Sequence, residues 1–360
     1  MEALENATLI LKNDEIKRIL SLEPCIDTME EAFKELAIGV GKNLPRTRIY
    51  TPIHPGEEAL YWFNNLAGAV PRLDAMALRI NSRITQEMIK GGKKRKEMLG
   101  RSAVGLLFLF SISTGELVAI MDDSHLSPIR VGATSGVALR YLAGRQASVL
   151  GLFGSGSQAR GQIEAAVASV KGLKRVKVFS MNPEHRERFV REMRGLVKTE
   201  ILGVDDPESV VKGSDIVVCA TNSSEPVFEG QWLEKGTTVV SIVGGDQTLK
   251  RREIDDVTLR RSRAIFVNSK LQIGLDEQAT LFDPSKKGIK REEVVFELGD
   301  LLTGRVRGRE EEDDIITYHN NCGMGIQFAA VGAIAYQKAV AAGMGRRVPA
   351  EWFTTTYEGR

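Results

Sequence analysis

A glycine-rich turn is the clearest chemical signal in the sequence. The stretch GLFGSGSQA contains Gly154, Gly156 and Ala159 at the spacing G-x-G-x-x-A. In this pattern the first glycine makes a tight turn, the second lets the backbone approach a pyrophosphate, and the small third residue allows close helix packing. An apolar strand precedes the turn and a helix follows it, so the helix N-terminus would face the phosphates, with Ser157 and Gln158 also in the predicted site. These five residues predict a dinucleotide-binding site.

The end of the next expected strand bears on which dinucleotide is bound. Residues 179–182 are Phe-Ser-Met-Asn, with no Asp or Glu where an NAD site usually holds the ribose hydroxyls. Ser180, Asn182 and the nearby Arg186 could instead accept the 2′-phosphate of NADP, although Arg186 could equally be an ordinary surface residue of a helix. The pattern favours NADP over NAD and leaves both open.

Two further polar residues follow expected strands. Thr221 ends DIVVCAT, and Asp246 follows TTVVSIVGG. Ligands of doubly wound sheets lie outside the carboxyl ends of the strands, so we expect Thr221 at the nicotinamide side and Asp246 near the reacting atoms. A strand-to-loop junction and a Gly-Gly-Asp turn are the ordinary alternatives. A carboxylate there would suit an amino-acid oxidation, because the amine must be neutral before its carbon loses hydride.

Four stretches together carry a family resemblance: SPIRVGATSGVALRYLA, VLGLFGSGSQA, VVCATNSSEPVF and VVSIVGGDQTLKRREID. The chain resembles the ornithine cyclodeaminase and mu-crystallin family, which also holds archaeal-type alanine dehydrogenases and ketimine reductases, over nearly its whole length. The resemblance implies a homodimer in which the N- and C-terminal segments form a substrate and dimerisation domain around an inserted Rossmann domain.

The resemblance also implies roles for single residues. Arg130 corresponds to the arginine that binds the substrate carboxylate, a task that suits a planar guanidinium, and Asp246 to the catalytic aspartate. Arg79 stands where the family usually has a lysine, and Arg48, with Arg46, lies in the family's N-terminal arginine region. Arginine stays protonated, so Arg79 could hold a carboxylate but not transfer a proton. We expect Arg48, Arg79 and Arg130 to bind substrate, with Asp246 and Arg79 in the catalytic set.

A second departure concerns residues 62–65, which are Trp-Phe-Asn-Asn where the cyclodeaminases carry a glutamate that contacts the side-chain end of ornithine. A diamine substrate therefore loses support. The leading interpretation is an NAD(P)-dependent imino-acid reductase or amino-acid dehydrogenase. One alternative is a cyclodeaminase that keeps its NAD bound and shows no net redox change. Another is a non-catalytic NADP-binding protein, as among the crystallin relatives.

The elements that must position these residues form two sets. Residues 44–123 are mostly strand-like, whereas strands and helices alternate through residues 128–321, as in a doubly wound parallel sheet. A small-residue helix follows within 323–345. We predict an α/β protein in which a Rossmann domain, residues 128–321, is inserted in an α+β substrate and dimerisation domain made of residues 1–127 together with 322–360.

Composition excludes several classes of function. The chain has 49 Lys+Arg and 47 Asp+Glu, so its net charge of +2 favours neither nucleic acid nor membranes. We interpret the basic run at residues 93–96 as an exposed loop. No segment resembles a signal peptide or approaches the roughly 20 apolar residues of a membrane span. Three scattered cysteines and four histidines without ligand spacing predict no disulfide framework and no metal site. We expect a cytoplasmic protein acting on a small amino or imino acid.

Overall fold

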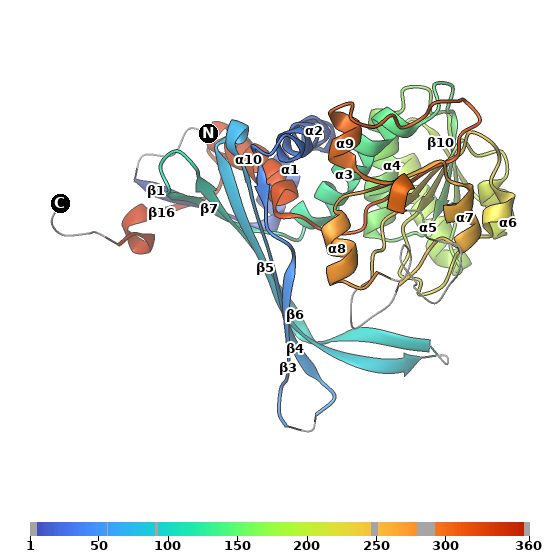
Figure 1. Ribbon diagram of the computed structural model, residues 1–360. Helices are drawn as coiled ribbons and strands as arrows, with labels where there is room; N and C mark the ends of the chain where they lie inside the picture. Colours follow the sequence, from blue (N-terminus) through green and yellow to red (C-terminus); the bar gives the residue numbers. More distant parts are fainter. Residues whose placement is uncertain (1–5, 56, 91–92, 246–250, 279–291, 356–360) are drawn as a thin grey trace. The chain divides into compact units, whose positions relative to one another are not determined.

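The computed structural model describes residues 6–55, 57–90, 93–245, 251–278 and 292–355 (Figure 1). The chain divides into two compact units. Unit 1 contains Met1–Ser21, Ile38–Ser127 and Met324–Arg360, and unit 2 contains Leu22–Ala37 and Pro128–Gly323.

Unit 1 is built on a mostly antiparallel sheet, called sheet A here. Its strand order is β16-β1-β7-β6-β5-β4-β2, with β3 also paired to β4, and only β1 and β7 run parallel. The strands are β1 (Ala7–Leu11), β2 (Lys42–Asn43), β3 (Thr47–Pro52), β4 (Leu60–Val70), β5 (Ala75–Lys90), β6 (Lys93–Ser111), β7 (Leu117–Asp122) and β16 (Arg346–Pro349).

Two helices, α1 (Asn13–Ile19) and α10 (Gly325–Ala341), complete unit 1. Glycines let α10 lie directly on one face of sheet A. A Cβ at Gly325 would lie 2.0 Å from the carbonyl carbon of Ala67, and a Cβ at Gly332 would lie 2.7 Å from Leu107 Cδ2. The small residues of this helix thus allow close backbone approach, and α10 covers the face that carries Leu107.

Strands β5 and β6 continue as a two-stranded ribbon beyond their neighbour (Figure 1). Pairing of β5 with β4 ends at Leu60 opposite Thr85, whereas pairing of β5 with β6 continues to Lys90 opposite Lys93. The interpretation of residues 93–96 as a loop is therefore wrong, because these residues belong to β6. Backbone hydrogen bonds to the opposite strand form whatever the side-chain charge, so a run of lysines does not prevent a strand.

Unit 2 is an all-parallel sheet, sheet B, with strand order β10-β9-β8-β11-β12-β15-β13-β14. The strands are β8 (Val149–Phe153), β9 (Arg175–Phe179), β10 (Glu200–Gly203), β11 (Ile216–Cys219), β12 (Thr238–Ser241), β13 (Ala264–Val267), β14 (Val295–Glu297) and β15 (Ile316–His319). Every residue of β11, β12, β13 and β15 is buried. Both faces are therefore covered, as in doubly wound proteins, and the predicted fold class is confirmed.

The helices of unit 2 are α2 (Leu22–Ala37), α3 (Leu126–Leu142), α4 (Ser157–Ser169), α5 (Pro183–Arg194), α6 (Pro207–Val211), α7 (Asp256–Arg261), α8 (Lys270–Leu275) and α9 (Leu298–Leu302). Helix α2 lies in this unit, although the predicted Rossmann domain began only at residue 128. Its contacts explain this placement, since Ile26 Cδ1 lies 2.8 Å from where a Cβ of Gly136 would be, and the Ala37 carbonyl accepts a 2.7 Å hydrogen bond from Arg305 Nη2.

Candidate functional site

The predicted glycine turn lies at the reversal of strand order in sheet B. The Gly154 N–H donates to the Phe179 carbonyl at 2.9 Å, and the Ala220 N–H donates to the Phe153 carbonyl at 2.8 Å. Gly154 has φ +114°, and a Cβ there would lie 2.3 Å from the Ala220 carbonyl oxygen. Only glycine fits this position. The turn therefore sits between β9 and β11, at the switch point where doubly wound sheets bind ligands.

Helix α4 offers anion donors directly after this turn. Gly156 is its exposed N-cap, no side chain caps the helix, and a Cβ at Gly156 would meet open space. The N–H groups of Ser157, Gln158 and Ala159 have no partner within the helix, because the first turn always leaves such donors. Among the described residues, no group bonds the buried Gln158 Oε1. An open cradle of N–H donors at a helix N-terminus fits a pyrophosphate.

The residues predicted for the ribose side have separate partners. Ser155 Oγ donates to Ser180 Oγ at 3.0 Å, which joins the turn to the end of β9. Asn182 caps α5 by accepting from His185 N at 2.9 Å. Arg186 is buried and forms an ion pair with Asp205. The structure thus brings Ser180 beside the glycine turn and places Arg186 in the packing of α5, and the cofactor roles of these residues stay predictions.

Thr221 belongs to a buried network that the sequence did not reveal. Its N–H and Oγ1 donate to Glu253 Oε1 at 2.6 and 2.8 Å. Ser241 Oγ, Ile242 N and Val243 N donate to Glu253 Oε2 at 2.9, 3.1 and 3.3 Å. Burial raises the pKa of Glu253, and the hydrogen bonds from Thr221 and Ser241 act against this rise. One carboxylate thereby ties the ends of β11 and β12 together at the edge of the glycine turn.

The predicted catalytic residue Asp246 lies outside the described residues, so its role stays a prediction. The chain leading to it is held by a second set of contacts. A Cβ at Gly244 would lie 2.0 Å from the Asn321 carbonyl oxygen. Gln278 Nε2 donates to that oxygen at 2.8 Å, and Asn321 Nδ2 donates to Gln278 Oε1 at 3.0 Å. The backbone at Gly244 is therefore fixed against the loop after β15.

Arg130 lies in the second turn of α3, beside the end of β15. A Cβ at Gly323 would lie 3.2 Å from both Nη atoms of Arg130, so the glycine leaves room for the guanidinium. Asn320 Nδ2 donates to the Val131 carbonyl and to Ser135 Oγ, both at 3.2 Å. These bonds join α3 to the carboxyl edge of sheet B, which is the edge that carries the glycine turn.

The remaining predicted residues, Arg79 and Arg48, lie in unit 1. Arg79 Nε donates to Asp123 Oδ2 at 2.5 Å and Nη1 donates to Asn64 Oδ1 at 3.0 Å. Arg48 stands opposite Asn64 in the β3–β4 register. Directly opposed residues project to the same face, so Arg48 and Arg79 share a face of sheet A. Asp123 was not predicted as a site residue.

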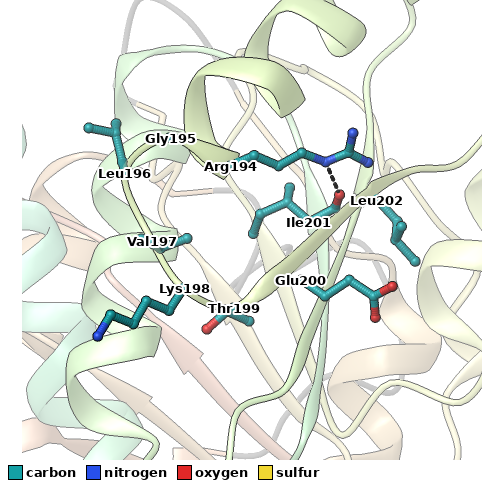
Figure 2. A pocket seen from close by; sticks show the side chains of 9 residues that line it. All are labelled: Arg194, Gly195, Leu196, Val197, Lys198, Thr199, Glu200, Ile201 and Leu202. Carbon is teal, nitrogen blue, oxygen red and sulfur yellow. Dashed lines mark hydrogen bonds between the residues drawn. The ribbon is translucent and has the colours of Figure 1, made fainter.

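A surface hollow is lined by residues 194–202, in the connection from α5 to β10 (Figure 2). Arg194 Nε donates across it to the Ile201 carbonyl at 2.9 Å. It lies where a helix ends and a strand begins, at the amino edge of sheet B. The glycine turn lies at the carboxyl edge, so this hollow is separate from the candidate cofactor site.

Several features were sought in the described part of the chain. No helix there is long and apolar enough to cross a membrane. No group of three or more His, Cys, Asp or Glu residues there could hold a metal ion. Cys25, Cys219 and Cys322 are buried free thiols.

Comparison with known proteins adds independent findings. The model of the ornithine cyclodeaminase/mu-crystallin family matches residues 6–343. A Delta(1)-pyrroline-2-carboxylate reductase of Bacillus cereus is 27% identical over 346 residues, covering 94% of this chain and 99% of the relative. The Thermococcus litoralis enzyme of that name, solved with NADH and L-proline, has a TM-score of 0.80 and 28% identity, covering 95% of this chain and all of that one. An archaeal alanine dehydrogenase dimer with bound NAD has a TM-score of 0.77 and 25% identity, covering 95% and 99%.

Proposed function

Because the chain belongs to the ornithine cyclodeaminase/mu-crystallin family, we propose that it is an NAD(P)-dependent oxidoreductase acting on the C–N bond of a small amino or imino acid. The observation that carries this proposal is the glycine turn, with Gly154 at the switch point of sheet B and the uncapped start of α4 after it. Relatives that cover nearly the whole chain are an imino-acid reductase and an amino-acid dehydrogenase with bound nicotinamide dinucleotides.

The cofactor would be held by the backbone of Gly154 and Gly156 and the first turn of α4, with Ser180 on the ribose side and Thr221 on the nicotinamide side. When bound, the nicotinamide supplies or accepts the hydride. No carboxylate ends β9, which supports NADP over NAD, since an acidic residue there would repel a 2′-phosphate. Arg186 pairs with Asp205 through Nη2 and would assist through its other guanidinium N–H groups.

The substrate would be bound through its carboxylate by Arg130, Arg79 and Arg48, and Asp246 would position the reacting nitrogen and move its proton. Arg130 is the predicted carboxylate-binding residue of unit 2, and a Cβ at Gly323 would lie 3.2 Å from both of its Nη atoms, so only a glycine there leaves the guanidinium unobstructed on that side. A planar guanidinium bonds a carboxylate through two parallel N–H groups, which an ammonium cannot do.

The test is a turnover screen. Purified protein would be mixed with NADPH or NADH and either cyclic imino acids or 2-oxo acids with ammonia or methylamine, with nicotinamide absorbance followed and products identified by mass. We expect cofactor consumption and amino-acid formation. Arg130→Lys should lower kcat/KM about 100-fold, whereas Arg145→Lys, at an exposed position just after α3, should not. Conversion of ornithine without net cofactor change would instead indicate cyclodeamination, and binding without any turnover a crystallin-like role.

The NADP preference has its own test. Ser180→Asp would place a carboxylate beside the glycine turn, so NADPH affinity should fall at least about tenfold while NADH affinity changes little. Fluorescence titration of both dinucleotides measures this directly. Tighter binding of NADH than of NADPH by the wild-type protein would contradict the preference.

We also propose that the protein is a homodimer. The face of sheet A opposite α10 is apolar and only partly buried, with side chains alternating with the buried ones that face the helix. It contains Met76, Leu78, Ile80, Leu106, Phe108, Phe110 and Ile120. The alanine dehydrogenase relative is described as a dimer. Light scattering should give twice the chain mass, reduced to one chain by Phe108→Glu but not by Met181→Glu, at a position that is 93% exposed. A one-chain wild-type mass would refute the dimer.

The proposed location is the cytoplasm, on the basis of cysteine usage. Cys25, Cys219 and Cys322 are free thiols, which suits a reducing compartment. Fractionation of source cells with an antibody against the protein would test this.

A further inference from the structure

The ion pair between Arg79 and Asp123 is enclosed within unit 1. The side chain of Arg79 is 11% exposed and that of Asp123 is 7% exposed. Arg79 also donates to Asn64, and its guanidinium carbon lies 5.4 Å from the centre of the Phe328 ring of α10. Four elements, β4, β5, the end of β7 and α10, therefore enclose a single pair of opposite charges.

A glycine within β6 makes room for this pair. A Cβ at Gly105 of β6 would lie 1.9 Å from Asp123 Oδ1 and 2.7 Å from its Cγ. The Asp123 N–H also donates to the Gly105 carbonyl at 3.1 Å. Any side chain at position 105 would displace the carboxylate, so backbone and side chain together fix Asp123 beside Arg79.

Stability alone does not explain why these charges are buried. Taking both out of water is unfavourable, and replacing a buried ion pair by apolar residues often leaves stability unchanged or increased. The neighbours of Arg79 across the sheet are Leu66 and Leu107, which are buried and apolar. An apolar pair would suit this environment, which points to a role in binding.

The pair still has bonding capacity on both sides. A guanidinium has five N–H donors, and Asp123 and Asn64 take donors from only two of the three nitrogens of Arg79. Among the residues that the structure describes, none donates to Asp123 Oδ1. The pair thus offers N–H donors beside a carboxylate oxygen. Arg79 suits a carboxylate and Asp123 suits a positively charged N–H, so a ligand that carries both groups matches both members of the pair.

We propose that Asp123 is a further substrate-binding residue, which accepts a hydrogen bond from the charged N–H of the amino or imino acid whose carboxylate Arg79 binds. This inference rests on the proposed function. By favouring the protonated imine, Asp123 would hold the substrate in the form that accepts hydride most readily. Arg79, which cannot transfer a proton, would act as an anchor only.

The first experiment replaces the charge and keeps the shape. In Asp123→Asn the amide oxygen can still accept from Arg79, but the negative charge is lost. We expect at least a tenfold rise in KM for the imino acid and a shift of the pH profile of kcat/KM, with unchanged affinity for NADPH by fluorescence. The matched control is Asp122→Asn, whose carboxylate accepts from Ser124 N and which should behave as wild type. Wild-type KM and kcat at every pH in Asp123→Asn would overturn the proposal.

A second experiment needs no folded variant. Competitive inhibition of the wild-type protein by the amino-acid product would be compared with that by an analogue in which CH₂ replaces the amine nitrogen. We expect the analogue to bind at least tenfold more weakly, and equal affinities would overturn the role of Asp123. If Asp123→Asn has the same turnover as the wild-type protein, this inference alone is wrong. If the wild-type protein shows no turnover, both the proposed function and this inference are wrong.

Discussion

Each unit buries a carboxylate, but the partners differ. In unit 2, Glu253 accepts five hydrogen bonds from neutral N–H and hydroxyl groups at the ends of β11 and β12. In unit 1, Asp123 accepts from the charged Arg79. Neutral backbone donors fix the path of the chain, whereas an ion pair presents charges that a ligand can compete for. We infer that Glu253 of unit 2 fixes the strand ends beside the proposed cofactor site, whereas Asp123 of unit 1 discriminates between substrates.

The largest expected effect comes from removing the acid of unit 2. Glu253→Ala would leave buried donors of Thr221, Ser241 and the backbone without an acceptor, which should lower the free energy of unfolding by about 3–5 kcal/mol. Urea denaturation measures this change, and NADPH affinity should fall with it. Glu187→Ala, at an exposed position of α5, is the control. A loss of less than about 1 kcal/mol in the free energy of unfolding would show that Glu253 does not hold the ends of β11 and β12 together.

An acid titration tests whether His319 in the core of unit 2 is protected from protons. Burial lowers the pKa of His319, at the end of β15, to about 4. The folded state therefore keeps His319 neutral. Because the unfolded chain binds this proton more readily, the free energy of unfolding should be undiminished above pH about 6.5 and should fall by about 3 kcal/mol as the pH drops towards 4. His319→Phe should flatten this part of the stability profile, whereas exposed His54→Gln should not. Identical slopes in wild type and His319→Phe would mean that His319 is accessible to protons.

A smaller loss is expected at the glycine turn. Gly154→Ala introduces a Cβ at φ +114° and close to the Ala220 carbonyl, and the backbone conformation alone should reduce stability by about 1–3 kcal/mol. Cofactor affinity should also fall, because the turn carries the start of α4. Gly144→Ala is the control, since nothing lies within 4 Å of its Cβ position. If Gly154→Ala and Gly144→Ala had equal melting temperatures and equal NADPH affinities, the glycine turn would not be needed for stability or for cofactor binding.

The smallest change in stability is expected for a double variant of the ion pair in unit 1. Replacing Arg79 and Asp123 together by leucine should alter the free energy of unfolding by at most about 1 kcal/mol, or stabilise the protein, while Arg79→Leu alone should cost about 3–5 kcal/mol, because it leaves an unpaired buried charge. The double variant should nonetheless lose turnover of the imino acid. If the double variant were as unstable as Glu253→Ala, the Arg79–Asp123 pair would be as important for stability as Glu253, which would contradict the difference proposed between the two units.

Local patterns in the sequence were sufficient for the cofactor edge. The turn at Gly154 and the start of the helix after it are encoded within nine residues. The alternation of strands and helices after residue 128 gave the doubly wound sheet in the same way. These features depend on neighbours in the chain, which is the information that a pattern contains.

Contacts between distant residues could not be predicted. Arg79 and Asp123 are 44 positions apart, and they meet only through the registers of β5, β6 and β7. Glu253 lies in the charged run RREID, where an acid is normally exposed, and it is buried because the chain folds back over two strand ends. One signal was present, since an isolated glycine such as Gly105 within a strand indicates close approach by another group. Nothing local indicated which group that would be.

The pairing of β1 with β16 has a consequence for synthesis. Ala7 of β1 stands opposite Pro349 of β16, so the two strands leave the ribosome about 340 residues apart, or roughly 20–70 s at ~5–20 residues per second. Until then one edge of β1 has no partner. An open strand edge is a template for pairing with other chains, so during synthesis this edge of β1 stays open to such pairing until the last strand of sheet A has been made.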